Sequence, residues 1–234
     1  METFPQIIRV DSQEKGLELA KNLLYEKVDN QTLLLLSGGS QKILYEVLAQ
    51  EKKLNPLAVA LVDERYGERM HDNSNEKMIR ETGFVSDLEQ RGISFFPVLK
   101  EGLDIEKTAQ EYENTLKGLF TKASKKIALM GIGPDGHTSG IAPNRSDFLN
   151  PLFTQNNKLV GYFDDANGNF GKRVTTTFEA LSQMDELIIL AFGSSKQEPL
   201  KKMFEEGPVE EIPSRFYTRP EIAPRTLLIT DQKI

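Results

Sequence analysis

Short apolar runs alternate with helical patterns along most of the chain. A near-continuous apolar run at residues 32–36 is typical of a strand that is buried on both faces. Other short runs, bounded by turn residues, predict further strands of the same kind. The complete set of expected strands is 6–10, 32–36, 57–62, 93–98, 127–130, 159–163, 187–192 and 226–229.

Between these runs, apolar residues recur at the three- and four-residue spacing of a helix that buries one face. Helices are expected after Ser12, after the glycine pair at 38–39, and over residues 74–81 and 104–119. Ser12 and Ser74 suit the N-cap position. The second helix is expected to bury Ile43, Leu44, Val47 and Leu48. Strand–helix alternation of this kind predicts an α/β fold with a mostly parallel sheet covered on both faces, in a single domain over residues 1–234.

Composition removes several classes of function. The 234 residues contain no cysteine, which excludes disulfides, thiol nucleophiles and zinc sites with Cys ligands. The two histidines, His71 and His137, leave little for a metal site, and none is expected. A net charge of −6 argues against a nucleic-acid-binding surface. No signal peptide or apolar run of about 20 residues is present, so we expect a cytoplasmic protein without membrane contact.

In open α/β sheets, ligands bind beyond the carboxyl ends of the strands. Gly38, Gly39 and Ser40 directly follow the run at 32–36. Glycines let the backbone approach an anion, and the N-terminus of the next helix favours negative charge. Alternatively, the segment is a tight turn with Ser40 as N-cap. It is not a P-loop, because the Gly-Lys-Ser/Thr ending is absent.

A second candidate, Asp63-Glu64-Arg65, follows the predicted strand 57–62. Two carboxylates and a guanidinium there can supply an acid/base group and a phosphate clamp. The alternative is a solvated, charged loop with an internal ion pair. Arg173 and Lys196 are further candidates for anion binding. Lys196 opens a helix, where its charge opposes the helix dipole unless an anion is bound.

The segment Gly-Ile-Gly-Pro-Asp-Gly-His-Thr at residues 131–138 matches G-x-G-x-x-G, the dinucleotide-binding pattern. We reject that interpretation because Asp135 would place a carboxylate in the pyrophosphate turn, and no crossover helix is predicted afterwards. The glycines instead present Asp135 and His137 together. A carboxylate beside an imidazole fixes its tautomer and raises its basicity, as a water-activating base requires. The alternative is a turn whose histidine has a structural role.

Five segments, in this order, resemble the 6-phosphogluconolactonase family: Ser-Gly-Gly-Ser, Asp-Glu-Arg with Asp-Asn-Ser-Asn, Gly-Ile-Gly-Pro-Asp-Gly-His-Thr, Arg-Val-Thr and Gly-Ser-Ser-Lys. The resemblance covers roughly residues 6–204 and is most specific in Gly-Pro-Asp-Gly-His-Thr. That family is grouped with glucosamine-6-phosphate deaminases. The resemblance implies a Rossmann-like three-layer sandwich.

The resemblance also implies a reaction, the hydrolysis of 6-phospho-glucono-1,5-lactone to 6-phosphogluconate in the oxidative pentose phosphate pathway, with no cofactor. His137 would be the general base and Asp135 would orient it. The residues implied to bind the sugar phosphate are Gly38, Gly39, Ser40, Asp63, Arg65, Arg173 and Lys196. The expected partner is this small molecule alone, bound by a monomer or small homo-oligomer.

The chain departs from the family pattern at three places near these residues. Gln41-Lys42 replaces Thr-Pro, and Lys42 is a candidate to reach the phosphate in compensation. Tyr66-Gly67 replaces Val-Pro, and residues 139–144 replace Ala-Ser-Leu-Phe-Pro-Gly. Two alternatives stay open: a glucosamine-6-phosphate deaminase, in which Asp63 would move the proton, and a sugar-phosphate-binding protein without catalysis.

Overall fold

The computed structural model describes residues 4–39, 41–144, 157–165 and 171–234. Its strands are β1 (Gln6–Arg9), β2 (Thr32–Leu36), β3 (Ala58–Leu61), β4 (Asp63–Arg65), β5 (Ser94–Phe96), β6 (Lys125–Gly131), β7 (Val160–Asp165), β8 (Gly171–Thr176), β9 (Glu186–Ala191) and β10 (Thr226–Thr230). Its α-helices are α1 (Gln13–Lys27), α2 (Lys42–Glu51), α3 (Asn75–Glu81), α4 (Phe84–Gln90), α5 (Ile105–Lys122), α7 (Phe178–Ser182) and α8 (Gln197–Phe204). The 3₁₀ helices of the described residues are η2 (Ser194–Lys196), η3 (Pro213–Thr218) and η4 (Ala223–Arg225). Among the described residues, no helix is long and apolar enough to cross a membrane.

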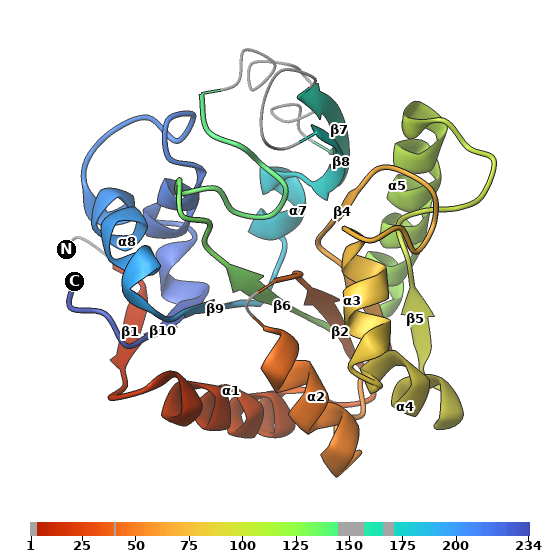
Figure 1. Cartoon of the computed structure of the whole chain (residues 1–234), viewed down its shortest axis with the longest axis horizontal. Helices are drawn as coiled ribbons and strands as arrows, with labels where there is room; N and C mark the ends of the chain where they lie inside the picture. Colours follow the sequence, from red (N-terminus) through yellow and green to blue (C-terminus); the bar gives the residue numbers. More distant parts are fainter. Residues whose placement is uncertain (1–3, 40, 145–156, 166–170) are drawn as a thin grey trace.

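The large sheet has seven strands in the order β1-β10-β9-β6-β2-β3-β5, all parallel. Helices α1 and α2 lie on one side of it, and α5 and α7 lie on the other (Figure 1). Every residue of β2 is fully buried, because this central strand has apolar layers above and below it. The predicted α/β fold with a mostly parallel sheet is therefore confirmed.

The predicted caps are confirmed at two helices. Ser12 accepts a hydrogen bond from the backbone of Lys15, and Ser74 accepts one from Lys77. The predicted buried face of α2, however, is wrong at Ile43, which is 50% exposed. Tyr45 takes the core position instead, because its hydroxyl donates to the carbonyl of Ser37 at 2.6 Å.

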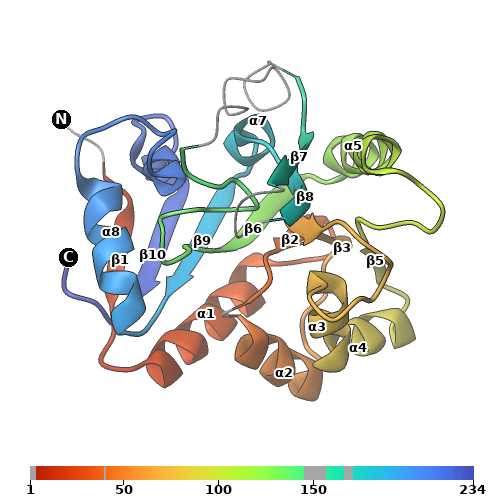
Figure 2. The ribbon, with the colours of Figure 1, turned by 45° about the horizontal axis from the view of Figure 1, so that its top comes forward.

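A second sheet, with the antiparallel order β4-β8-β7, was not predicted. Figure 2 shows β7 and β8 of the small sheet near β3 of the large sheet. The two sheets meet at Val62, between β3 and β4. Its amide donates to Leu36 of the large sheet at 2.8 Å, and its carbonyl accepts from Thr176 of the small sheet at 2.8 Å. One extended segment therefore belongs to both sheets, and the expected strand 57–62 stops one residue early.

Candidate active site

A cavity of about 210 Å³ opens where β2, β3, β6 and β9 end. This is the edge at which an open α/β sheet binds its ligands. The described residues that line it are Ser37, Gly38, Gly39, Asp63, Arg65, Asn75, Gly131, Ile132, Gly133, Pro134, His137, Ser139, Arg173 and Lys196.

The cavity brings together most of the candidates that the sequence indicated. Seven of them line it: Gly38, Gly39, Asp63, Arg65, His137, Arg173 and Lys196. Asp135 is not among the lining residues but is bonded to His137, which is. Ser40 lies outside the described residues. The candidates come from five separate segments of the chain, so the fold assembles them at a single place.

The loop after β6 holds a histidine–aspartate pair. Nδ1 of His137 lies 2.6 Å from Oδ1 of Asp135, which also accepts from the His137 amide at 3.1 Å. A carboxylate accepts the Nδ1 proton, so Nε2 is the basic nitrogen of the ring. Burial favours protonated Asp135, but the hydrogen bond and charge of His137 outweigh it, and the pKa of Asp135 lies below its usual value.

Glycine is required at position 133 by the histidine ring itself. A methyl group at Gly133 would lie 2.0 Å from Nδ1 and Cε1 of His137. The amide of Gly133 also donates to the carbonyl of His137 at 2.8 Å, which closes the loop. The imidazole therefore lies directly against the loop backbone, and its orientation is set by both the backbone and Asp135.

The histidine loop, residues 132–139 after β6, is also bonded to the C-terminal segment. The hydroxyls of Thr138 and Tyr217 lie 2.5 Å apart, and the amide of Ser214 donates to the carbonyl of Gly136 at 3.0 Å. Tyr217 is fully buried, and this burial raises the pKa of its hydroxyl. The histidine loop is thus anchored by η3, a segment about 80 residues further along the chain.

On its other side, the loop is tied to the small sheet through Ser139. This serine has φ +55°, a left-handed conformation that costs free energy outside glycine. Its hydroxyl lies 2.7 Å from that of Thr175 and 2.9 Å from that of Thr176. The change from alanine in the family pattern to Ser139 therefore adds a polar contact between the loop and β8.

The cavity wall carries more positive than negative side chains. Arg173 donates to Asp63 at 2.9 Å, and both residues are buried. Arg65 and Lys196 line the same cavity, and Lys196 donates to the carbonyl of Ile132 at 2.6 Å. Burial lowers the pKa of Lys196, while the charge of Asp135 opposes that shift. With three cations against one carboxylate among the described residues of the wall, the cavity suits an anionic ligand.

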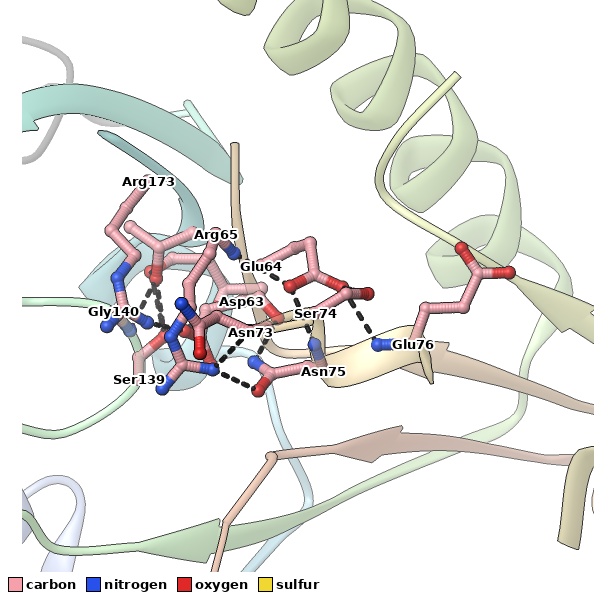
Figure 3. A network of polar contacts seen from close by, with 12 residues as sticks. Asp63, Glu64, Arg65, Asn73, Ser74, Asn75, Glu76, Ser139, Gly140 and Arg173 are labelled. Carbon is pink, nitrogen blue, oxygen red and sulfur yellow. Dashed lines mark hydrogen bonds and ion pairs between the residues drawn. The ribbon is translucent and has the colours of Figure 1, made fainter. Parts of the chain in front are cut away.

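Asp63 and Glu64 do not act as a pair, and neither lies in a solvated loop. They are 5% and 0% exposed, and the pleat of β4 points Asp63 and Arg65 into the cavity but Glu64 away from it. Glu64 accepts hydrogen bonds at the start of α3 from Ser74 Oγ and the amides of Asn75 and Glu76, at 2.8 to 2.9 Å (Figure 3). Its role is therefore to cap a helix.

Two polar residues near the cavity have structural partners. Nδ1 of His71 accepts from the amide of Asn73 at 3.2 Å, and its Nε2 lies 3.0 Å from the carbonyl of Arg65. The amide of Gln41 is fully buried and donates to the carbonyl of Met130 at 2.9 Å. Lys42 is exposed and does not line the cavity, so it is not placed to reach a ligand there.

Asn75 lines the cavity but was not among the predicted site residues. In the sequence it stands beside the capping Ser74, in a stretch that helix capping explains by itself. The available signal was the Asp-Asn-Ser-Asn segment that contributes to the family resemblance. Among the described residues, no group of three or more His, Asp or Glu side chains is placed to hold a metal ion.

Fold and cavity together define a doubly wound α/β protein that presents cations and a histidine–aspartate pair to an anionic ligand. The family described as glucosamine-6-phosphate isomerases/6-phosphogluconolactonase matches residues 13–224. The chain therefore belongs to this family, and the resemblance seen in its motifs is confirmed.

Individual relatives agree with this assignment. The 6-phosphogluconolactonase of Synechocystis sp. is 29% identical over 192 residues, which cover 79% of this chain and 76% of the relative. That of Thermotoga maritima is 29% identical over 202 residues, 86% of each chain. The structure of a 6-phosphogluconolactonase from Shewanella baltica superimposes with a TM-score of 0.82 at 19% identity, over the whole of both chains. The last comparison confirms the fold.

Proposed function

We propose that the protein hydrolyses 6-phospho-glucono-1,5-lactone to 6-phosphogluconate, the step of the oxidative pentose phosphate pathway that the motifs imply. The observation that carries the proposal is the His137–Asp135 pair beside a cavity rich in cations. Family membership and the names of the relatives support it. A lactone is already activated toward water, so a positioned base and an oriented substrate are sufficient.

In the proposed mechanism, Nε2 of His137 removes a proton from a water molecule whose oxygen attacks the lactone carbonyl carbon. The tetrahedral intermediate then breaks its bond to the ring oxygen. The imidazolium returns its proton to that oxygen, which becomes a hydroxyl of the open acid. Asp135 holds the ring in the required tautomer and stabilises the imidazolium that forms between the two steps.

The cations of the cavity would bind the phosphate and the sugar hydroxyls. Arg65 in β4 and Lys196 in η2 line the cavity from two separate segments, so each can hold a different group of the ligand. Arg173 is neutralised by Asp63, which suits this pair to hydroxyl groups. Gly39 has φ +79°, and a side chain there would meet nothing within 4 Å, which leaves its backbone accessible to a ligand.

The glucosamine-6-phosphate deaminase alternative needs a carboxylate that shuttles a proton between sugar carbons. Asp63 is the candidate, but its Oδ2 is held by the buried guanidinium of Arg173 at 2.9 Å. The deaminase pattern also requires a glutamate shortly after the histidine, and none stands between His137 and Pro143. Both observations favour the lactonase. Release of ammonia from glucosamine 6-phosphate, lost in Asp63→Asn, would favour the deaminase instead.

The proposal is tested by following loss of freshly made 6-phosphogluconolactone by NMR, against its spontaneous hydrolysis. We expect strong acceleration by the wild type and a decrease in kcat of about 10²- to 10⁴-fold in His137→Ala, the usual contribution of a general base. His71→Ala is the matched control, because it removes the other histidine, whose ring bonds only to backbone among the described residues. Turnover of His137→Ala at the wild-type rate would refute the mechanism, and no acceleration by the wild type would refute the function.

A further inference from the structure

We propose that Asn75 is a positioning residue, which holds Arg65 in place for the phosphorylated substrate, and that residue 38 is glycine in order to seat the Asn75 amide. This inference rests on the proposed function for the ligand but not for the placement of Arg65. Asn75 is 4% exposed, and it lies at the wall of the cavity, between the β2–α2 turn and β4. Figure 3 shows it beside Arg65 and Asp63.

Both ends of the Asn75 amide are occupied. Nδ2 donates to the backbone carbonyl of Asp63 at 2.9 Å, and Oδ1 accepts from Nη1 of Arg65 at 2.8 Å. This orientation is set by the partners, since a carbonyl can only accept and a guanidinium can only donate. The backbone amide of Asn75 is in turn fixed by Oε1 of Glu64 at 2.8 Å. The residue therefore joins the start of α3 to all three residues of β4.

The result for Arg65 is a guanidinium held from one side. Its Nη1 donates to Asn75 Oδ1 and to the backbone carbonyl of Asn73 at 2.9 Å, which uses two of its five N–H groups. Among the residues that the structure describes, nothing accepts from the other three, on Nε and Nη2. Those three donors remain available in the cavity, in the planar arrangement that binds phosphate well.

The two neighbouring glycines of the β2–α2 turn differ in what requires them. A methyl group at Gly38 would lie 2.1 Å from Oδ1 and 2.5 Å from Cγ of Asn75, and the three nearest atoms all belong to the Asn75 side chain. Gly38 is not among the residues with positive φ, so its backbone suits other amino acids. Gly39 has φ +79° and open space around it. Gly38 therefore makes room for Asn75, and Gly39 permits the turn.

The experiment is a double-mutant cycle at these two positions, read by calorimetric binding of 6-phosphogluconate and by KM and kcat. Gly38→Ala and Asn75→Ala are each expected to weaken binding and raise KM about tenfold, because each releases Arg65, with kcat changed much less. The double variant should bind within about twofold of Asn75→Ala, because the clash disappears with the amide. Asn73→Ala is the matched control, since Asn73 holds the same guanidinium through its backbone only.

Two outcomes would overturn the proposal. In the first, Gly38→Ala weakens binding in the Asn75→Ala background by the same factor as in the wild type. This would mean that the ligand itself needs Gly38. The other is wild-type KM in Asn75→Ala. Should Asn75→Ala fail to fold, Asn75→Asp keeps its volume, and its carboxylate should weaken binding by neutralising Arg65 and repelling the carbonyl of Asp63.

A third readout separates this proposal from the proposed function. In protein with isotope-labelled arginine, the side-chain NMR signal of Arg65, assigned with Arg65→Lys, reports its order without any ligand. We expect the signal to move and broaden in Asn75→Ala and Gly38→Ala but not in Asn73→Ala. An unchanged signal in Asn75→Ala refutes the positioning role even if the lactonase is active. The expected signals in an inactive wild type refute the function alone.

Discussion

In the large sheet, Leu33–Leu36 of β2 and the central parts of β6 and β9 consist of buried apolar side chains. The small sheet instead contains a buried ion pair and a group of bonded hydroxyls. Apolar burial is non-directional, so neighbouring side chains can change if volume is kept. A buried polar group needs a specific partner at a specific distance. The small sheet is therefore the more exacting structure, and it forms one wall of the cavity.

The largest expected difference in stability concerns charge. Asp63→Asn should lower the free energy of unfolding by about 3–5 kcal/mol, because it leaves the Arg173 guanidinium buried without a counter-charge. Urea denaturation measures this. The matched control is Asp164→Asn, which removes a pair with Lys172 on the same sheet that is about half exposed and is expected to matter by less than about 1 kcal/mol. Equal losses in the two variants would contradict the distinction.

A core substitution in the large sheet should cost stability alone. Leu34→Ala, in the centre of β2, is expected to lower the free energy of unfolding by about 2–5 kcal/mol. The fraction that remains folded should keep its KM, because Leu34 does not line the cavity. Ile43→Ala is the control for an exposed apolar residue and should change stability by about 0.5 kcal/mol or less. A raised KM in Leu34→Ala would show that the sheets are coupled.

Two buried tyrosines allow a finer comparison. Tyr217 bonds to Thr138 in the histidine loop, and Tyr112 bonds to the backbone of Leu61 in the large sheet. Tyr217→Phe removes one buried hydrogen bond and should cost about 1 kcal/mol in thermal or chemical unfolding. Tyr112→Phe removes two, from the amide and to the carbonyl of Leu61, and should cost at least as much. Only Tyr217→Phe should also lower kcat, because Thr138 adjoins His137. A similar kcat loss in both variants would mean that the loop is not specifically anchored.

The smallest expected effect at neutral pH is that of the Lys196 charge on ligand affinity. Burial lowers its pKa, so it loses its proton at a lower pH than an exposed lysine does. Affinity for 6-phosphogluconate should therefore fall as pH rises toward 10.5, the ordinary pKa of lysine, and this fall should be weaker in Lys196→Arg, which stays charged. The pH dependence of folding stability has the opposite sign. Charged Lys196 disfavours the folded state at neutral pH, and this cost in stability disappears as pH rises through its pKa. Parallel pH profiles of both proteins would contradict the assignment.

The difference between the two sheets also decides which strands could be predicted from the sequence. The run at 32–36 is apolar except for Thr32, so its pattern alone predicts a buried strand, and β2 has the same bounds. Strand β8 is Gly-Lys-Arg-Val-Thr-Thr, a mostly polar pattern. It is a strand because it pairs with β4, whose Asp63 is 110 residues distant from Arg173. Such pairing is not visible in a local pattern.

The same limit applies to the candidate site. The glycines around His137 indicated a loop that presents two side chains, and the structure places that ring against Asp135. The role of Glu64 was hidden because its partners, at the start of α3, lie 10 to 12 residues away. Asn75 was missed for a related reason: an asparagine beside an N-cap is ordinary in a sequence, and only the folded chain brings it to Arg65.

The extended segment formed by β3, Val62 and β4 passes from one sheet to the other. For the fold of this segment, the number of residues matters more than the type of each residue. Side chains along it alternate in direction, so Asp63 and Glu64 face opposite ways although they are neighbours. Deleting or inserting one residue before Val62 would reverse that parity. Glu64 would then enter the cavity and Asp63 would face α3, and neither side chain fits its new surroundings. This stretch can therefore diverge by exchange of amino acids, whereas a change of its length by one residue would exchange a ligand-facing carboxylate with a structural one.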